Sequence, residues 1–214
     1  LGGHVPVAKY PGASPLEKPV DADEAAFLDE VKESLAMSGG LSEAPRQRAL
    51  LDTFVVHYTD PRTGAVRALF EFLRLYGSDQ KLRYGVQDAL KDQLVAYRGR
   101  RILLVAHGLG SMFVHDTLFK LGPAAPSLDL VTVGSPLGLR AVQRRLKCKA
   151  GPDGKLAVPE RIQSWTNLVG DGDVMNAPLG LSDRFRWADD GRRIFDLPVS
   201  VDTGWPHHRW EGYA

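Results

Sequence analysis

The sequence predicts an α/β domain built around a mostly parallel sheet. Residues 101–106 form a short, continuous apolar run, typical of a parallel strand that is buried on both faces, and residues 128–133 are expected to form a second buried strand. Each run passes through glycine into a segment with helical spacing, so strands and helices alternate along the chain. A chain of 214 residues can bury a substantial core, and we expect residues 1–214 to form a single domain.

The other elements follow from hydrophobic periodicity and from turn residues. The expected helices are 22–37, 65–76, 84–97, 110–121 and a segment through Leu139, Val142 and Leu146. The further expected strands are 53–58, 162–169 and 193–199. Residues 1–20 are rich in Gly and Pro, so we expect 1–50 to be an irregular or helical N-terminal segment, or a partial cap.

Composition excludes several classes of function. The 27 basic and 26 acidic residues give a formal net charge of +1, so we expect no nucleic-acid-binding face, and we interpret the basic cluster 140–149 as a solvated helix face. The single cysteine, Cys148, excludes an intrachain disulfide and slightly favours a cytoplasmic location. No apolar run is long enough to cross a bilayer, and residues 1–10 lack the regions of a signal peptide.

The segment Ala106-His107-Gly108-Leu109-Gly110 joins the first buried strand to its helix. A nucleophile elbow has this form: its central residue holds a positive φ, and small residues stand two positions before and after it because the sharp turn leaves no room for side chains there. Ala106 and Gly110 are small, and Gly108 adopts a positive φ without steric penalty. Glycine at the centre nevertheless supplies no nucleophilic oxygen.

Two other interpretations of this turn stay open. One is a dinucleotide-binding loop, although Phe113 is too bulky for its third small position and no acidic residue ends a strand about twenty positions later. The other is an ordinary glycine-rich turn without chemistry. Ser111 is an alternative nucleophile, but it lies one turn into the helix, where we expect its hydroxyl to bond to the local backbone.

Residues 105–111, Val-Ala-His-Gly-Leu-Gly-Ser, resemble the elbow of lipase- and esterase-like bacterial serine hydrolases of the α/β-hydrolase superfamily, with glycine in place of the serine. Residues 130–139 are similar to the next strand and turn of that family, and 165–168 to the strand that leads to its catalytic acid. Residues 206–213 resemble its C-terminal stretch with the catalytic histidine. The resemblance covers about residues 84–214 and implies the α/β-hydrolase fold.

The resemblance also implies where the catalytic acid lies, since the order in this fold is nucleophile, acid, histidine. Gly170-Asp171-Gly172-Asp173 follows the expected strand and offers two carboxylates. Asp173 is favoured because the apolar residues 174–175 follow it, and Asp171 stays an alternative. Without the resemblance, this loop would be interpreted as a solvated turn.

Two adjacent histidines occupy the region where the family's catalytic base is found. Pro206 before it and Trp210 after it favour His207, whereas the spacing to Gly212 favours His208. The histidine would take the serine proton and return it to the leaving group, with the carboxylate fixing its tautomer.

The start of the chain departs from the family pattern. Members usually open with a strand ending in His-Gly and a glycine-containing loop, whose N–H forms an oxyanion hole together with that of the residue after the nucleophile, here Leu109. Residues 1–50 contain no such strand, and residues 1–4 are at most a remnant. We expect one or more N-terminal strands to be missing from this chain, because loss of a central strand would expose an edge of the sheet.

Two functions follow from this interpretation. The first is a serine hydrolase of carboxylic esters or lipid acyl groups, inactivated here by Gly108, whose partner is a small-molecule ester or lipid substrate. The second is a natural pseudoenzyme of the same fold that binds a ligand or partner without turnover. No histidine cluster has metal-ligand spacing, so neither a metal nor another cofactor is expected. The oligomeric state does not follow from the sequence.

Overall fold

The computed structural model describes residues 22, 25, 65–170, 180–187 and 191–199. Its helices are α3 (Ala65–Ser78), α4 (Gln80–Ala96), α5 (Gly110–Leu121) and α6 (Arg140–Gln143), with 3-10 turns η1 (Gly122–Ala124), η2 (Pro136–Gly138) and η3 (Leu181–Asp183). Its strands are β1 (Ile102–His107), β2 (Leu128–Val133), β3 (Leu156–Ala157), β4 (Ile162–Gly170), β5 (Phe185–Arg186) and β6 (Phe195–Val199).

The larger sheet has the order β1-β2-β4-β6, and every neighbouring pair in it is parallel. This confirms the prediction of an α/β chain with a mostly parallel sheet. The strands expected at 128–133, 162–169 and 193–199 correspond to β2, β4 and β6. The two-residue strands β3 and β5 form a separate parallel pair that the sequence did not predict.

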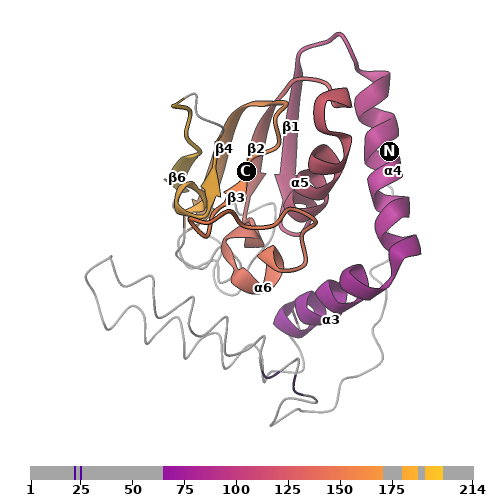
Figure 1. Cartoon of the computed structure of the whole chain (residues 1–214), viewed down its shortest axis with the longest axis vertical. Coiled ribbons are helices and arrows are strands. Elements are labelled where there is room, and N and C mark those ends of the chain that lie inside the picture. The colour runs from indigo at the N-terminus through magenta and orange to yellow at the C-terminus, as the bar shows by residue number, and fades with distance from the viewer. Residues whose placement is uncertain (1–21, 23–24, 26–64, 171–179, 188–190, 200–214) are drawn as a thin grey trace, which may run out of the picture.

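Each connection in the sheet moves to the next strand on the same side, from β1 towards β6. Right-handed crossovers that advance in one direction all lie on one face of a sheet. Figure 1 shows α5 packed between β1 and α4. We call this side the covered face, and its core includes Leu130 of β2, Trp165 of β4 and Met112 of α5.

The prediction that the first strand is buried on both faces is wrong for the side of the sheet opposite the covered face. Leu103 and Val105 of β1 are 65% and 46% exposed, so β1 is not buried on both faces. A continuous apolar run does not reveal that the strand lies at an edge of the described sheet, where one face has less cover. We call this side the open face, and the register places on it, with Leu103 and Val105, the side chains of His107, Asp129, Val131, Val133, Ser164, Thr166, Leu168, Phe195 and Leu197.

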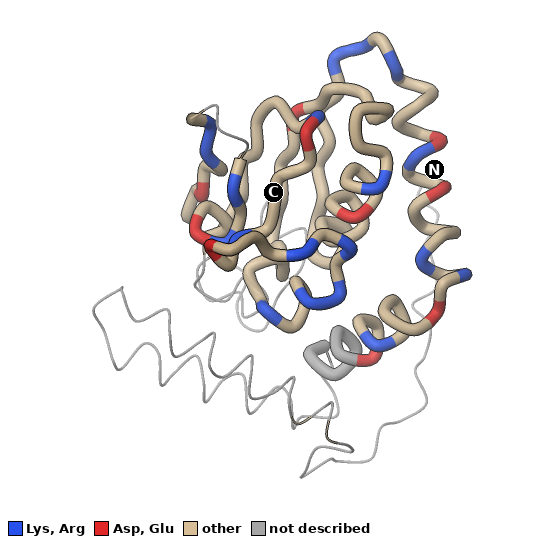
Figure 2. The backbone as a smooth tube through the Cα atoms, viewed as in Figure 1, with Lys and Arg blue, Asp and Glu red and all other residues tan. Residues whose placement is uncertain are grey.

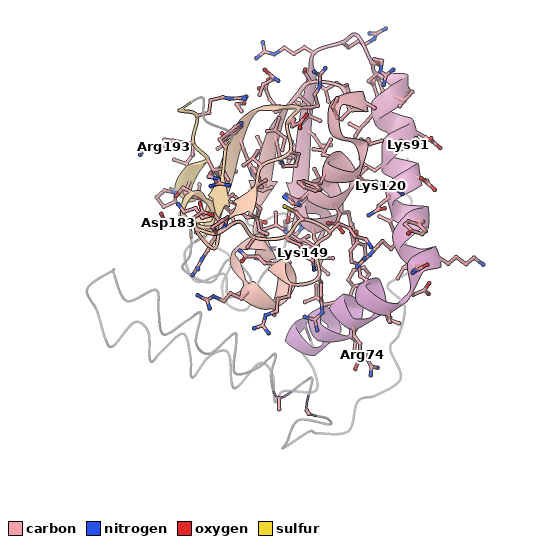
Figure 3. All side chains as sticks on the ribbon, viewed as in Figure 1. Arg74, Lys91, Lys120, Lys149, Asp183 and Arg193 are labelled. Atoms are coloured by element: carbon pink, nitrogen blue, oxygen red, sulfur yellow. The ribbon has the colours of Figure 1, made fainter. Side chains whose placement is uncertain are left out.

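Helix boundaries differ from the predicted ones where polar capping decides them. α3 runs through Gly77 to Ser78, and Asp79 then caps α4 by accepting the N–H of Leu82 at 3.0 Å. α4 therefore begins at Gln80, four residues before the predicted start at Tyr84. Figure 3 shows Arg74 and Lys91 on the sides of α3 and α4 that face away from the sheet.

The segment after β2 is less helical than its apolar spacing predicts. Ser135 caps the 3-10 turn η2, and Leu139 is extended at ψ 128°, which confines α6 to four residues. Figure 2 shows basic residues gathered around α6. Most basic side chains of 140–149 are exposed, which confirms the interpretation of this cluster as solvated.

Ala22 and Ala25 are helical, in agreement with the predicted helix 22–37. The expected strand 53–58 and the irregular region 1–20 lie outside the described residues. Within the described ranges, no helix is both long and apolar enough to span a membrane.

Candidate active site

The carboxyl ends of the parallel strands define the candidate site. The register aligns His107 of β1 with Val133 of β2, and Val133 with Leu168 of β4. In open parallel sheets, ligands bind in the crevice beyond these ends. The turns that follow β1 and β2 therefore lie side by side at the edge where chemistry is expected.

Gly108 forms the turn between β1 and α5. Its φ is +54°, a left-handed conformation, and among the described residues only glycines have positive φ. The Gly108 N–H donates to the carbonyl of Val133 at 2.9 Å, which fixes the turn against β2. Gly108 therefore holds the positive φ that the sequence predicts for this turn, a conformation that glycine adopts without steric penalty.

The small residues on either side of Gly108 have different explanations. Ala106 is 4% exposed and faces the core, so a larger side chain would meet packed neighbours. A Cβ added to Gly110 would meet no heavy atom within 4 Å outside its chain neighbours and its own helical backbone. The expectation that the sharp turn leaves no room at Gly110 is therefore wrong in this structure.

Ser111 has a buried hydroxyl that is fully engaged. Its Oγ donates to the carbonyl of Gly108 at 2.7 Å and lies 2.7 Å from Ser135 Oγ. Because the Ser111 proton is used on Gly108, Ser135 donates to Ser111, while its own oxygen accepts the N–H of Leu137 at 3.3 Å. The prediction that Ser111 bonds to the local backbone is confirmed, and its bonding and burial disfavour a role as nucleophile.

The start of α5 carries the other polar groups of this turn. The N–H groups of Ser111 and Met112 donate to the carbonyls of Gly108 and Leu109. The N–H groups of Leu109 and Gly110 have no acceptor in the part of the chain that the structure describes. Unpaired N–H groups at a helix start can bind an anion or a developing oxyanion.

The predicted acid and histidine lie outside the described residues, namely Asp173 with its alternative Asp171, and His207 with its alternative His208. The structure does describe the strands that precede them. β4 ends at Gly170, directly before the acidic loop, and β6 ends at Val199, eight positions before His207.

A ladder of buried and half-buried polar side chains crosses the sheet, and the sequence did not reveal it. The register places Thr132, Asn167 and Asp196 directly opposite one another on β2, β4 and β6. Thr132 Oγ1 donates to Asn167 Oδ1 at 2.8 Å, and Asn167 Nδ2 donates to Asp196 Oδ1 at 2.8 Å. Trp165 Nε1 donates to Thr132 Oγ1 at 2.9 Å, so the ladder is tied to the core.

Asp196 also fixes the segment that returns from the acidic loop. Its two carboxylate oxygens accept the N–H groups of Leu181 and Ser182 at 2.8 and 2.9 Å. A Cβ on Gly180 would lie 2.5 Å from Asp196 Oδ2, which explains glycine at that position. Nothing in sequence spacing predicts this contact, because it depends on strand register.

A second buried polar cluster surrounds Tyr76 of α3. The hydroxyl of Tyr76 donates to Asp116 Oδ2 at 2.9 Å and accepts from Gln87 Nε2 at 3.3 Å. The Arg83 guanidinium lies 4.4 Å from the centre of the Tyr76 ring. Burial, together with the Asp116 carboxylate, raises the pKa of Tyr76, so this hydroxyl stays protonated as a donor. The cluster joins α3, α4 and α5.

His115 is a core residue on α5. It is 0% exposed, its Nε2 donates to the carbonyl of Ala157 at 3.2 Å, and its ring contacts Phe119 and Phe185. Burial lowers its pKa, so the ring is neutral at physiological pH. Within the described ranges, no group of three His, Cys, Asp or Glu side chains could hold a metal ion.

No family model, curated protein or solved structure matches this chain. The fold class, an α/β chain with a four-stranded parallel sheet and flanking helices, is what the described geometry establishes.

Proposed function

We propose that this chain is the scaffold of a serine hydrolase for carboxylic esters or lipid acyl groups, with Gly108 at the nucleophile position. The observation that supports this most is the turn itself. Gly108 has a φ of +54°, follows a parallel strand, and precedes a helix of twelve residues at the carboxyl edge of the sheet. That combination is what the backbone of a nucleophile elbow requires, and it supports the proposal.

The proposed chemistry needs a serine at position 108. Its Oγ would attack the acyl carbonyl while His207 takes the hydroxyl proton, and the alcohol would then leave with that proton. Asp173 would hold the tautomer of His207, and water would hydrolyse the acyl-enzyme in a second, equivalent step. The Leu109 N–H, which has no acceptor in the described ranges, would donate to the oxyanion.

Strand order and chain length are compatible with this assignment. Asp171 and Asp173 come directly after β4, whose carboxyl end lies at the same edge as Gly108. β6 is three strands from β1, so the two strand ends are about 14 Å apart at about 4.8 Å per strand. The eight positions from Val199 to His207 can span up to roughly 28 Å, which is more than enough.

A specific observation favours the second candidate, a pseudoenzyme that binds without turnover. Ser111 and Ser135 are the hydroxyls next to Gly108, and they are bonded to each other, to the Gly108 carbonyl and to the Leu137 N–H. The turn as it stands therefore presents donors for an anion and lacks an available nucleophile. A carboxylate product or a carboxylate-bearing ligand fits such a site.

The test is hydrolysis of short- and medium-chain p-nitrophenyl esters by the unchanged chain, Gly108→Ser and Gly108→Ala. Both substitutions strain the same φ, but only serine restores an oxygen, so Gly108→Ala is the matched control. We expect turnover and reaction with a fluorophosphonate probe in Gly108→Ser alone, and loss of turnover on adding His207→Ala. If Gly108→Ser folds but neither turns over nor reacts with the probe, the hydrolase proposal fails. Binding of a short-chain fatty acid by the unchanged chain would then favour the pseudoenzyme.

A further inference from the structure

A cavity of about 540 Å³ is lined by the β3–β5 pair and by the segment that enters β6. Its described lining comes from the turn before β3, from η3 and β5, and from residues 191–194. The buried side chains of Phe185, Trp187 and Ile194 give it an apolar wall. Cavities that bind small molecules have volumes of about 300–1,000 Å³ and combine apolar walls with a few polar groups. This cavity has the size and the wall of such a site.

Charged side chains also line this cavity, and the basic ones are in excess. Four described lining residues are cationic and two are acidic, namely Lys155, Arg186, Arg192 and Arg193 against Asp153 and Asp183. Asp153 Oδ2 lies 3.4 Å from Arg186 Nη1, so these two charges are paired. Within the described ranges, Lys155 and Arg193 have no ion pair. The described lining therefore has an excess of two positive charges, which suits a dianion.

The Arg192 guanidinium is held in place at the cavity. Its Nη1 donates to the carbonyls of Ile162 and Gln163 at 2.9 and 3.2 Å, and its Cζ lies 4.9 Å from the centre of the Trp187 ring. A guanidinium fixed in this way loses little conformational freedom when an anion binds. The buried indole N–H of Trp187 has no acceptor among the described residues, and an acceptor on a bound molecule would remove the cost of this unmet donor.

The cavity is separate from the candidate active site. β4 begins at Ile162, so Arg192 contacts the amino end of that strand. Gly108 instead follows the carboxyl end of β1, and the sheet is parallel. Figure 3 shows Arg193 and Asp183 on the side of the molecule where β6 lies. A ligand in this cavity would therefore bind away from the turn at Gly108.

We propose that this cavity binds a small phosphate monoester with an aromatic body. A phosphate monoester carries a charge of about −1.5 to −2 at pH 7, which matches the excess positive charge of the described lining. Guanidinium groups bind phosphate oxygens through paired, charge-assisted hydrogen bonds. The aromatic body packs against the apolar wall, where Trp187 and Phe185 offer ring surfaces. The proposal does not depend on the hydrolase assignment.

The experiment titrates the whole chain with 1-naphthyl phosphate and follows the indole N–H signals by NMR. We expect the Trp187 signal, assigned with Trp187→Phe, to shift on binding. Trp165, whose Nε1 donates to Thr132 Oγ1 inside the sheet, is the internal control, and its signal should move much less. Inorganic phosphate and 1-naphthol each supply one half of the probe. Each should bind at least about 10-fold more weakly than the whole probe.

Charge reversal tests the basic side chains independently. Lys155→Glu combined with Arg193→Glu should weaken the binding of 1-naphthyl phosphate by about 10-fold or more. Lys91→Glu combined with Arg100→Glu is the matched control, because it changes the net charge equally at exposed positions outside the cavity lining. The control should weaken binding by less than about 2-fold, since solvent screens distant charges. Circular dichroism confirms that each variant remains folded.

Three results overturn the proposal. The first is a Trp187 signal that 1-naphthyl phosphate leaves unchanged in the native chain, a readout that needs no charge-reversal variant to fold. The second is equal weakening of binding by the two double variants, which would place the anion elsewhere or make its attraction non-specific. The third is binding of 1-naphthol or inorganic phosphate as tightly as the whole probe, because one half of the proposed ligand would then contribute nothing.

Discussion

The turns that follow β1 and β2 have similar backbone geometry but differ in whether they could take part in chemistry. Gly108 and Gly134 follow these strands with φ of +54° and +57°. Each donates its N–H to the adjacent strand, Gly108 to Val133 at 2.9 Å and Gly134 to Leu168 at 3.3 Å. The left-handed glycine is therefore part of how a parallel strand ends here, and it does not by itself indicate a nucleophile.

The two turns diverge in the residues that come next. After Gly108 the chain enters the twelve-residue helix α5, and the N–H groups of Leu109 and Gly110 have no acceptor among the described residues. After Gly134, Pro136 has no N–H, and the N–H of Leu137 is capped by Ser135. The start of a long helix with free donors thus separates a candidate site from a structural turn.

The largest expected effect contrasts Gly108→Ser with Gly134→Ser. Both place a serine at a positive φ, so both carry similar strain, but only position 108 lies beside the Leu109 N–H, which has no acceptor among the described residues. We expect Gly108→Ser to hydrolyse p-nitrophenyl esters at least about 10³-fold faster than Gly134→Ser, on the scale of triad effects. Equal rates in the two variants would remove the distinction between the turns.

A second prediction concerns the ladder that holds the end of β2. Asn167→Leu removes both hydrogen bonds of Asn167, so the buried Thr132 hydroxyl loses its acceptor and Asp196 Oδ1 keeps only the Leu181 N–H. We expect a loss of about 2–4 kcal/mol in the free energy of unfolding, measured in urea. The control is Gln163→Leu, an exposed position on the same strand, for which the loss should stay below about 0.5 kcal/mol.

A third prediction tests whether the two glycines are equivalent as backbone elements. Gly108→Ala and Gly134→Ala each force a side chain into the left-handed region, and each should cost about 1–2 kcal/mol of unfolding free energy. Gly110→Ala, where a Cβ has room, should instead stabilise α5 by up to about 1 kcal/mol. A destabilised Gly110→Ala would restore the steric explanation for that position.

The smallest effect is a pH dependence that belongs to α5 and not to the β2 turn. Burial lowers the pKa of His115 from its ordinary value of 6.5, so the folded chain binds fewer protons at this group than the unfolded chain. Its contribution to stability is complete above pH 6.5 and is lost as the pH falls through 6.5 towards the folded pKa. The slope should reach at most about 1.4 kcal/mol per pH unit. His115→Gln should remove this part of the slope in urea titrations between pH 7.5 and roughly 5.

Local signals in the sequence predicted the parts of the fold that depend on neighbouring residues. β2 and α5 were predicted with their observed bounds, because apolar runs and glycine stops are local. The ladder of Thr132, Asn167 and Asp196 was not, since strand register joins residues about thirty positions apart. The exposed face of β1 was missed for the same reason: an apolar run contains no information about which element covers it.

In the candidate site, too, features set by neighbouring residues could be predicted, and features set by distant contacts could not. The turn at Gly108 could be predicted because an elbow is a short, contiguous segment. The burial of Arg83 and Gln87 around Tyr76 could not, because these polar residues interrupt the apolar stripe of α4 and depend on packing against α3 and α5. The roles of Asp173 and His207 remain predictions from resemblance.

The grip of Asp196 on Leu181 and Ser182 has a consequence for how this molecule could change over time. Residues 171–179, which include both candidate acids, follow β4 in the sequence. They precede Leu181 and Ser182, whose N–H groups are bound by the Asp196 carboxylate of β6. With both anchor points secured, doubling the length of such an insert costs only about 0.6 kcal/mol of closure entropy. We therefore expect the sheet to tolerate substitutions and insertions within residues 171–179, whether these arise in evolution or in a selected library.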